Sequence, residues 1–188
     1  SYDFAMRQLL RSNRQLSDKD LFEALAFEDI RMAADVLRPV YDTTQGGDGY
    51  VSLEVSPHLA NDMERTVADV HRLWNAVQRP NLMIKIPATP AGIPAIAQCI
   101  AAGMNINVTL MFSLQNYADV SQAYIRGLGH RAETAPDSSA PWPVSVFLVD
   151  LVLDRKLERL FHEHPVEVVE VGTVLERADA FGEFLVIE

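Results

Sequence analysis

Polar side chains interrupt three short apolar runs of this sequence, and together they could carry out carbonyl chemistry. They are Glu54 in the first run, Lys85 in the second, and Asn107 and Thr109 in the third. Alternate residues of a β-strand point to opposite faces, so the polar residues of each run share one face and the apolar residues the other. Adjacent strands lie roughly 4.8 Å apart, which would bring a carboxylate, an amine, an amide and a hydroxyl within reach of one another.

Lys85 has the most specific chemistry of this set. An amine held away from water is partly unprotonated near neutral pH. It can then attack a ketone and eliminate water, and the resulting iminium makes cleavage of a neighbouring carbon–carbon bond feasible. The alternative is a structural ion pair between Lys85 and Glu54, although buried pairs are seldom the most stable packing choice. Asn107 and Thr109 alone would be ordinary hydrogen-bonded core residues, and their position beside Lys85 makes them site candidates.

The elements that would hold these residues alternate between strands and helices. The β-prone runs are 50–56, 81–87, 105–112 and 144–150, and the helical patterns that follow them are 63–77, 90–103, 114–128 and 154–162. This alternation is typical of βα units and a parallel sheet. We therefore expect an α/β fold of the (β/α)8 TIM-barrel type, with four clear βα units and two possible further strands at 166–171 and 183–187. A complete barrel typically needs about 250 residues. A chain of 188 residues is therefore expected to form an incomplete barrel.

The first forty residues are expected to form two helices ahead of the sheet. Ser17 and Asp20 are spaced as an N-terminal capping pair, and the apolar repeat that follows is expected to end at Pro39. A second capping pair, Asn61 with Glu64, would begin the helix after the first strand. The Gly-rich segment 43–49 is expected to be a turn.

A polar, Pro-rich loop is expected at 129–143, and there is no internal repeat. We therefore predict a single domain over residues 1–188.

The composition argues against several functional classes. The chain has 26 acidic and 16 basic residues, a formal charge of −10, and no basic cluster, so nucleic-acid binding is not expected. Its one cysteine, Cys99, excludes an internal disulfide and is expected to be a small buried residue. No segment is long and apolar enough to span a membrane, and a cytoplasmic location is the simpler expectation.

Other polar features are weaker candidates. His58 is expected to face solvent at a helix start, and His162 and His164 lack a matching set of metal ligands. The segment GGDG at 46–49 lacks the lysine and the spacing of a phosphate-binding loop.

Long passages of the chain, in order, resemble the transaldolase family, particularly its bacterial branch. They are LFEALAFEDIRMAADVLRPVY, DGYVSLEVSPHLAND, RPNLMIKIPATPAGIPAI and INVTLMFSLQNY, within residues 2–128. The resemblance implies a (β/α)8 barrel that transfers a dihydroxyacetone unit between sugar phosphates of the pentose phosphate pathway. It also implies a Schiff-base mechanism with neither a metal nor an organic cofactor.

The resemblance assigns a role to each candidate residue. The lysine of the family's IKIPAT-like strand forms the Schiff base and corresponds to Lys85. The glutamate and threonine that hold a catalytic water correspond to Glu54 and Thr109. The asparagine that binds substrate hydroxyls corresponds to Asn107.

The chain also departs from the family pattern. Two barrel strands precede the matching region in the family, carrying an aspartate that serves as general acid and base and an asparagine, and neither has a counterpart here. Asp150 ends the fourth predicted strand and could replace the aspartate, but a strand-end acid is more often a helix cap or solvated. The family's phosphate-binding serine and arginine correspond to Val146 and Leu151, which offer phosphate no charge-assisted hydrogen bonds.

These departures leave two alternatives open. One is a Schiff-base aldolase that acts on an unphosphorylated ketone, as Val146 and Leu151 suggest. The other is a non-catalytic homologue that self-associates, because an open half-barrel exposes sheet edges and apolar helix flanks.

Overall fold

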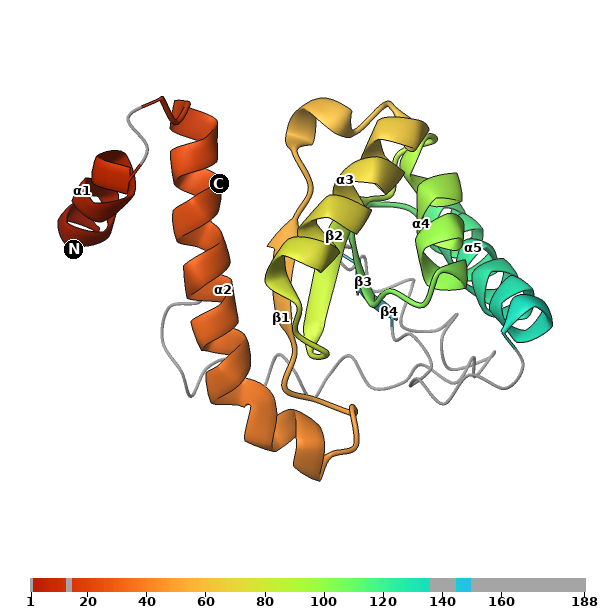
Figure 1. Cartoon of the computed structure of the whole chain (residues 1–188). Helices are drawn as coiled ribbons and strands as arrows, with labels where there is room; N and C mark the ends of the chain where they lie inside the picture. Colours follow the sequence, from red (N-terminus) through yellow and green to blue (C-terminus); the bar gives the residue numbers. More distant parts are fainter. Residues whose placement is uncertain (1, 13–14, 136–144, 150–188) are drawn as a thin grey trace.

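A parallel sheet organises the part of the chain that this computed structural model describes, residues 2–12, 15–135 and 145–149. The described strands are β1 (Val51–Glu54), β2 (Leu82–Pro87), β3 (Ile106–Met111) and β4 (Ser145–Val149), and they lie side by side in chain order (Figure 1). All three pairings are parallel. The predicted α/β class is confirmed. The strands are one to three residues shorter than the β-prone runs that predicted them.

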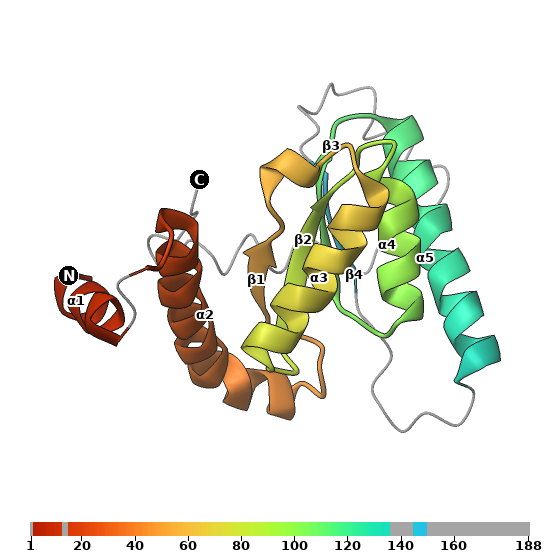
Figure 2. The ribbon, with the colours of Figure 1, turned by 45° about the horizontal axis from the view of Figure 1, so that its top comes forward.

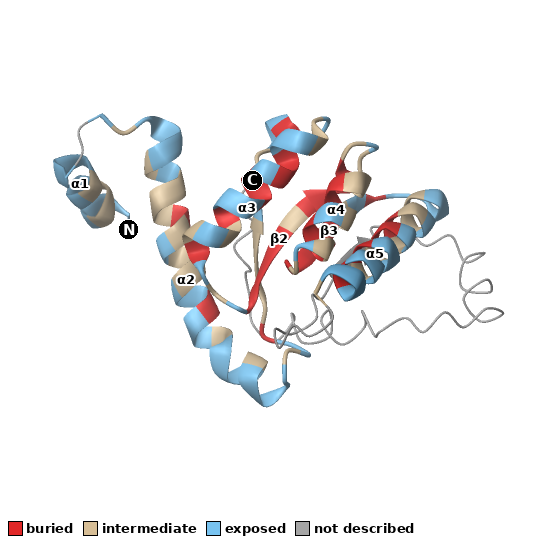
Figure 3. Ribbon diagram, turned by 45° about the vertical axis from the view of Figure 1, so that its right-hand side comes forward, coloured by how far each residue is buried: buried red, intermediate tan, exposed pale blue. Residues whose placement is uncertain are grey.

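Three helices connect the strands and pack on one side of the sheet. They are α3 (Met63–Val77), α4 (Gly92–Ala101) and α5 (Leu114–Thr134), with a short 3-10 helix, η1 (Pro57–Leu59), before α3 (Figure 2). The apolar faces of β2 and β3 are buried against this layer, as predicted (Figure 3). Their side chains, which are all 0% exposed, are Leu82, Ile84, Ile86, Ile106 and Val108. Burial of this face supplies the main driving force that fixes the strands in register.

Two helices precede the sheet, α1 (Asp3–Ser12) and α2 (Asp18–Thr43), and α2 lies alongside β1 and α3. The predicted capping pair is confirmed, since Ser17 and Asp20 form a complete capping box. The prediction that the helix ends at Pro39 was wrong, because α2 continues for four further residues. Proline removes one helical hydrogen bond, but Pro39 lies on an exposed face where water can bind the carbonyl group left without its helical partner.

Two other predicted helix ends differ from the structure. The N-cap of α3 is Asp62, whose carboxylate accepts a hydrogen bond from the backbone N–H of Arg65, so the predicted Asn61–Glu64 pair was wrong. Helix α5 extends to Thr134 and includes six residues that were expected to form a loop. Its last turns are held by Arg131, which is buried against the turn at Gly103.

The remaining predicted elements, the helix at 154–162 and the strands at 166–171 and 183–187, lie outside the described residues, as does most of the predicted loop.

Several smaller expectations can also be compared with the structure. Cys99 is 0% exposed, which confirms it as a small buried residue, and its burial raises the pKa of the thiol to about 12. His58 is exposed in η1, as expected. The Gly-rich turn is confirmed: Gly49 has a φ of 82°, and a Cβ there would lie 2.5 Å from the backbone nitrogen of Tyr41. No described helix is long and apolar enough to cross a membrane.

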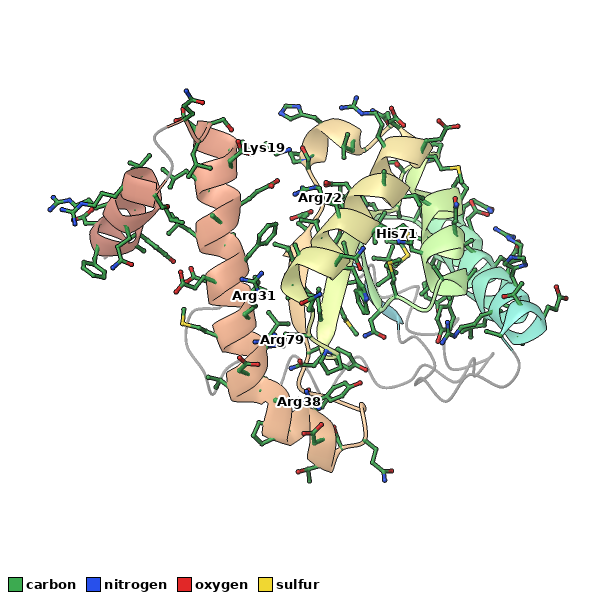
Figure 4. All side chains as sticks on the ribbon, viewed as in Figure 1. Lys19, Arg31, Arg38, His71, Arg72 and Arg79 are labelled. Atoms are coloured by element: carbon green, nitrogen blue, oxygen red, sulfur yellow. The ribbon has the colours of Figure 1, made fainter. Side chains whose placement is uncertain are left out.

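Arginine side chains join α2 to α3 and its C-terminal turn, and Figure 4 shows Arg31, Arg72 and Arg79 between the two helices. Arg72 binds both carboxylate oxygens of Glu23, at 2.7 and 2.9 Å. Arg79 binds Asp35 in the same bidentate way, at 2.6 and 2.9 Å. Two-pronged contacts of this kind fix orientation as well as distance. They hold α2 in place beside β1.

Asn81 makes the buried counterpart of this connection. Its side chain is 0% exposed, and its amide nitrogen donates to the carbonyl oxygens of Ala34 in α2 and Gly49 before β1, at 2.8 and 2.9 Å. One side chain at the start of β2 thus ties together the helix and the loop that position β1.

We predict that Asn81→Asp lowers the free energy of unfolding by about 2–6 kcal/mol. Aspartate has the same shape but cannot donate to the two buried carbonyl groups when ionised, and each group left unsatisfied costs about 1–3 kcal/mol. Chemical denaturation followed by circular dichroism would measure the loss. Asn61→Asp on the exposed surface is the matched control and is expected to change stability by less than about 0.5 kcal/mol. Equal stability of the two variants would contradict this role for Asn81.

Candidate active site

The register of the sheet places three of the predicted site residues in one row across neighbouring strands. Glu54 on β1 pairs with Lys85 on β2, and Lys85 pairs with Asn107 on β3. Thr109 lies two residues further along β3, opposite Pro87. The alternation of side chains puts all four on the sheet face opposite the buried apolar side chains. The structure therefore brings together the four residues singled out in the sequence.

Lys85 is a partly buried amine close to one carboxylate. Its side chain is 26% exposed, and its Nζ atom lies 3.9 Å from Oε2 of Glu54, whose own side chain is 49% exposed. This distance is at the outer limit of an ion pair. The sequence predicts an amine held away from water, and within the described residues Lys85 is only partly so. Among the described strands β1 has a neighbour on one side alone, so Glu54 remains open to water on the other.

A hydrogen bond between side chains of non-neighbouring strands shows that this face is concave. The Asn107 amide nitrogen on β3 donates to the Ser52 hydroxyl on β1 at 3.0 Å, across the intervening strand β2. In a flat sheet the two strands would be about 9.6 Å apart, and side chains as short as serine and asparagine cannot span that separation. The sheet must therefore curl toward this face, as the inner wall of a barrel does.

Two buried polar atoms on the concave face have no hydrogen-bond partner among the described residues. They are Oδ1 of Asn107, whose residue is 9% exposed, and Oγ1 of Thr109. Nearly all buried polar groups in native proteins are paired, so unpaired ones call for an explanation. Here both lie on the face that carries the Lys85 amine, where they can bind a polar ligand.

The end of β3 differs from the predicted alternation. Leu110 and Phe112 were expected on the apolar face with Ile106 and Val108, and both are instead exposed. The pairing with β4 shifts register between Val108 and Met111, and Leu110 adopts a left-handed backbone with a φ of 57°. As a result, the side chain of Met111 is buried in the core and that of Leu110 is exposed. Leucine rarely adopts this conformation, so nothing in the local sequence signals it.

Ser52 shares the face of Glu54 by the alternation of β1, but nothing in the sequence alone marks it as a site residue. Asn105, which shares that face by alternation, instead donates to the carbonyl oxygens of Pro80 and Leu82 at 3.2 and 3.1 Å. These hydrogen bonds connect the start of β3 to the start of β2, so the polar side chain of Asn105 has a structural role.

The remaining candidates contribute little to the described site. Val146 pairs with Asn107 in the register of β4, but its side chain, together with Asp150, Leu151 and the pair His162 and His164, lies outside the described part. Within the described ranges there is no group of three or more histidine, cysteine or acidic side chains arranged to hold a metal ion.

Comparison with known proteins relates the sequence of this chain to one family. The family model for transaldolase/fructose-6-phosphate aldolase matches residues 1–152, beyond the 2–128 passage that carries the recognisable motifs. A transaldolase of Thermobifida fusca (strain YX) is 46% identical over 169 residues, which are 88% of this chain and 45% of the relative. A transaldolase of Acidothermus cellulolyticus is 46% identical over 150 residues, and one of Trichodesmium erythraeum is 42% identical over 151 residues. These two matches include 78% and 77% of this chain, and 40% of each relative.

The chain thus spans less than half the length of these relatives, and the part that matches contains the whole row of polar residues on the concave face. It belongs to the transaldolase/fructose-6-phosphate aldolase family.

Proposed function

We propose that this chain carries the Schiff-base site of a transaldolase, which transfers a dihydroxyacetone unit between sugar phosphates through Lys85. The observation that supports this most directly is the row of Glu54, Lys85 and Asn107 across three strands of a concave sheet. Family membership supplies the reaction class, and the geometry supplies an amine, an acid and an amide in contact distance of one ligand.

In this mechanism the Lys85 amine attacks the carbonyl carbon of a ketose, and a carbon–nitrogen bond forms. Loss of water from the adduct leaves an iminium. A base then takes the proton of the hydroxyl group on the departing side, and the carbon–carbon bond two atoms from nitrogen breaks. Its electron pair moves toward the iminium nitrogen, and an aldehyde leaves while a three-carbon enamine stays on Lys85. Attack of the enamine on a second aldehyde forms the new bond, and hydrolysis releases the product and restores the amine.

The neighbouring groups serve the proton transfers and the orientation of substrate. Glu54 lies near enough to Lys85 to exchange a proton with it through one water molecule. Oγ1 of Thr109 and Oδ1 of Asn107, which have no partner within the described part of the chain, can bind that water and a substrate hydroxyl. No part of this proposal requires a metal or an organic cofactor.

We also propose that the described sheet is part of a (β/α)8 barrel within one domain. Each described strand from β1 to β3 is followed by a helix on the same side, the pairing is parallel throughout, and the opposite face is concave. These are the features of a barrel wall, whose concave face lines the barrel interior.

Reductive trapping tests the Schiff base. We expect incubation of the chain with dihydroxyacetone and sodium borohydride to add the mass of one reduced ketone at Lys85, located by peptide mass spectrometry. Lys85→Ala should abolish the adduct, whereas Lys19→Ala, which removes an amine 64% exposed on α2, should leave it unchanged. Equal labelling of Lys85→Ala and the unmodified chain would refute the assignment of Lys85.

The same experiment separates the alternatives. Trapping with fructose 6-phosphate as well as with dihydroxyacetone supports sugar phosphates as substrates. Trapping with dihydroxyacetone alone supports an aldolase for an unphosphorylated ketone. No trapping with either would favour the non-catalytic, self-associating homologue, which light scattering would then detect as an assembly larger than one chain.

A second prediction separates catalysis from a structural ion pair. We expect Glu54→Gln and Lys85→Met each to change the free energy of unfolding by less than about 1 kcal/mol. The two charges are 3.9 Å apart and Glu54 is half exposed, so solvent screens their attraction. Chemical denaturation of both variants would measure the change. A loss of about 3–5 kcal/mol, typical of a broken buried pair, would mean that the pair holds the sheet together.

A further inference from the structure

Ser52 contacts one of the proposed site residues, because its hydroxyl accepts a hydrogen bond from the side chain of Asn107. Ser52 lies on β1, two residues before Glu54, and shares its face of the strand. Its hydroxyl is the acceptor in this contact, and the Asn107 side-chain N–H2 group is the donor. This contact fixes which end of the Asn107 amide faces Ser52.

A side-chain amide has two chemically opposite ends. The nitrogen end donates hydrogen bonds and the oxygen end accepts them, so rotation by half a turn exchanges a donor for an acceptor. In this structure the nitrogen end is bound to Ser52, and Oδ1 is buried with no partner among the described residues. The end of Asn107 that is left for a ligand is therefore the acceptor.

We propose that Ser52 is a positioning residue, which holds the Asn107 amide so that its oxygen accepts a hydrogen bond from a hydroxyl group of the ketone bound at Lys85. This inference rests on the proposed Schiff-base function and adds a selectivity to it. A ketone that carries a hydroxyl next to its carbonyl can donate to Oδ1, and a ketone without one cannot. The site would thus favour hydroxylated ketones over plain ones before any phosphate is recognised.

The test compares two small ketones, dihydroxyacetone and acetone, which differ in the hydroxyl groups. In borohydride trapping at Lys85, Ser52→Ala is expected to raise the half-saturating concentration of dihydroxyacetone on the order of tenfold, the effect of one lost hydrogen bond. Trapping of acetone should change by less than about twofold, because acetone has no hydroxyl to place. A structural defect would weaken trapping of both ketones alike.

Several variants control this comparison. Ser52→Thr keeps the hydroxyl and should behave as the unmodified chain does. Ser56→Ala is the matched control, since Ser56 lies just beyond the same strand and its side chain makes no capping hydrogen bond. Ser52→Cys keeps the size of the side chain if Ser52→Ala does not fold. In the Asn107→Ala background, Ser52→Ala should have no further effect, because the two residues act through one contact.

Nuclear magnetic resonance of the side-chain amide of Asn107 gives an independent measurement. Its two proton signals, identified by their loss in Asn107→Ala, should move on Ser52→Ala and stay in place on Ser56→Ala. Unmoved signals, or an equal loss of acetone and dihydroxyacetone trapping, would overturn the role of Ser52. Failure of the unmodified chain to trap either ketone would instead overturn the Schiff-base function and the ligand selectivity derived from it, while moved amide signals would still show that Ser52 holds Asn107.

Discussion

The burial of one sheet face determines where every side chain of the proposed site lies. Leu82, Ile84 and Ile86 are fully buried against the helices, so Lys85 and Met83 must point to the other side. A slip of one residue in β2 would place the amine in the apolar core and three large aliphatic side chains on the concave face. The free-energy cost of that exchange fixes the register of β2. This register places Lys85 between Glu54 and Asn107. Hydrophobic packing on one side thus specifies the polar chemistry on the other.

Strand β1 needs additional support because it is short and is paired with one described strand only. It carries both Ser52 and Glu54, so its position sets two of the polar contacts of the site. Helix α2 provides this support from outside the sheet through the bidentate contacts of Arg72 and Arg79. The contact of Asn81 with the loop before β1 anchors the strand at its start. Residues far from Lys85 therefore determine how closely the Glu54 carboxylate approaches its amine.

The polar row was predictable from the sequence, whereas the shape of the surface that carries it was not. Alternation along 50–56, 81–87 and 105–112 was sufficient to place Glu54, Lys85 and Asn107 on one face, because alternation is a local property of strands. The contact between Ser52 and Asn107 depends on the curvature of three strands together, which no single segment encodes. The left-handed backbone at Leu110 and the continuation of α2 past Pro39 likewise result from tertiary packing or solvent exposure that overrides local preference.

Transfer and simple aldol cleavage begin with the same intermediate, and the access of water to it decides between them. An enamine on Lys85 that meets water is protonated and then hydrolysed, whereas one that is shielded persists until a second aldehyde arrives. Within the described residues, the half-exposed Glu54 at the open side of β1 is the group of the row most accessible to water, and Asn107 toward the centre of the sheet is the least accessible. Closure of the β1 side would exclude water without moving Lys85, because the register that holds the amine depends on the buried face alone. In the mechanism proposed for Lys85, the balance between transferase and aldolase chemistry would therefore depend on what borders β1, whereas formation of the Schiff base would not.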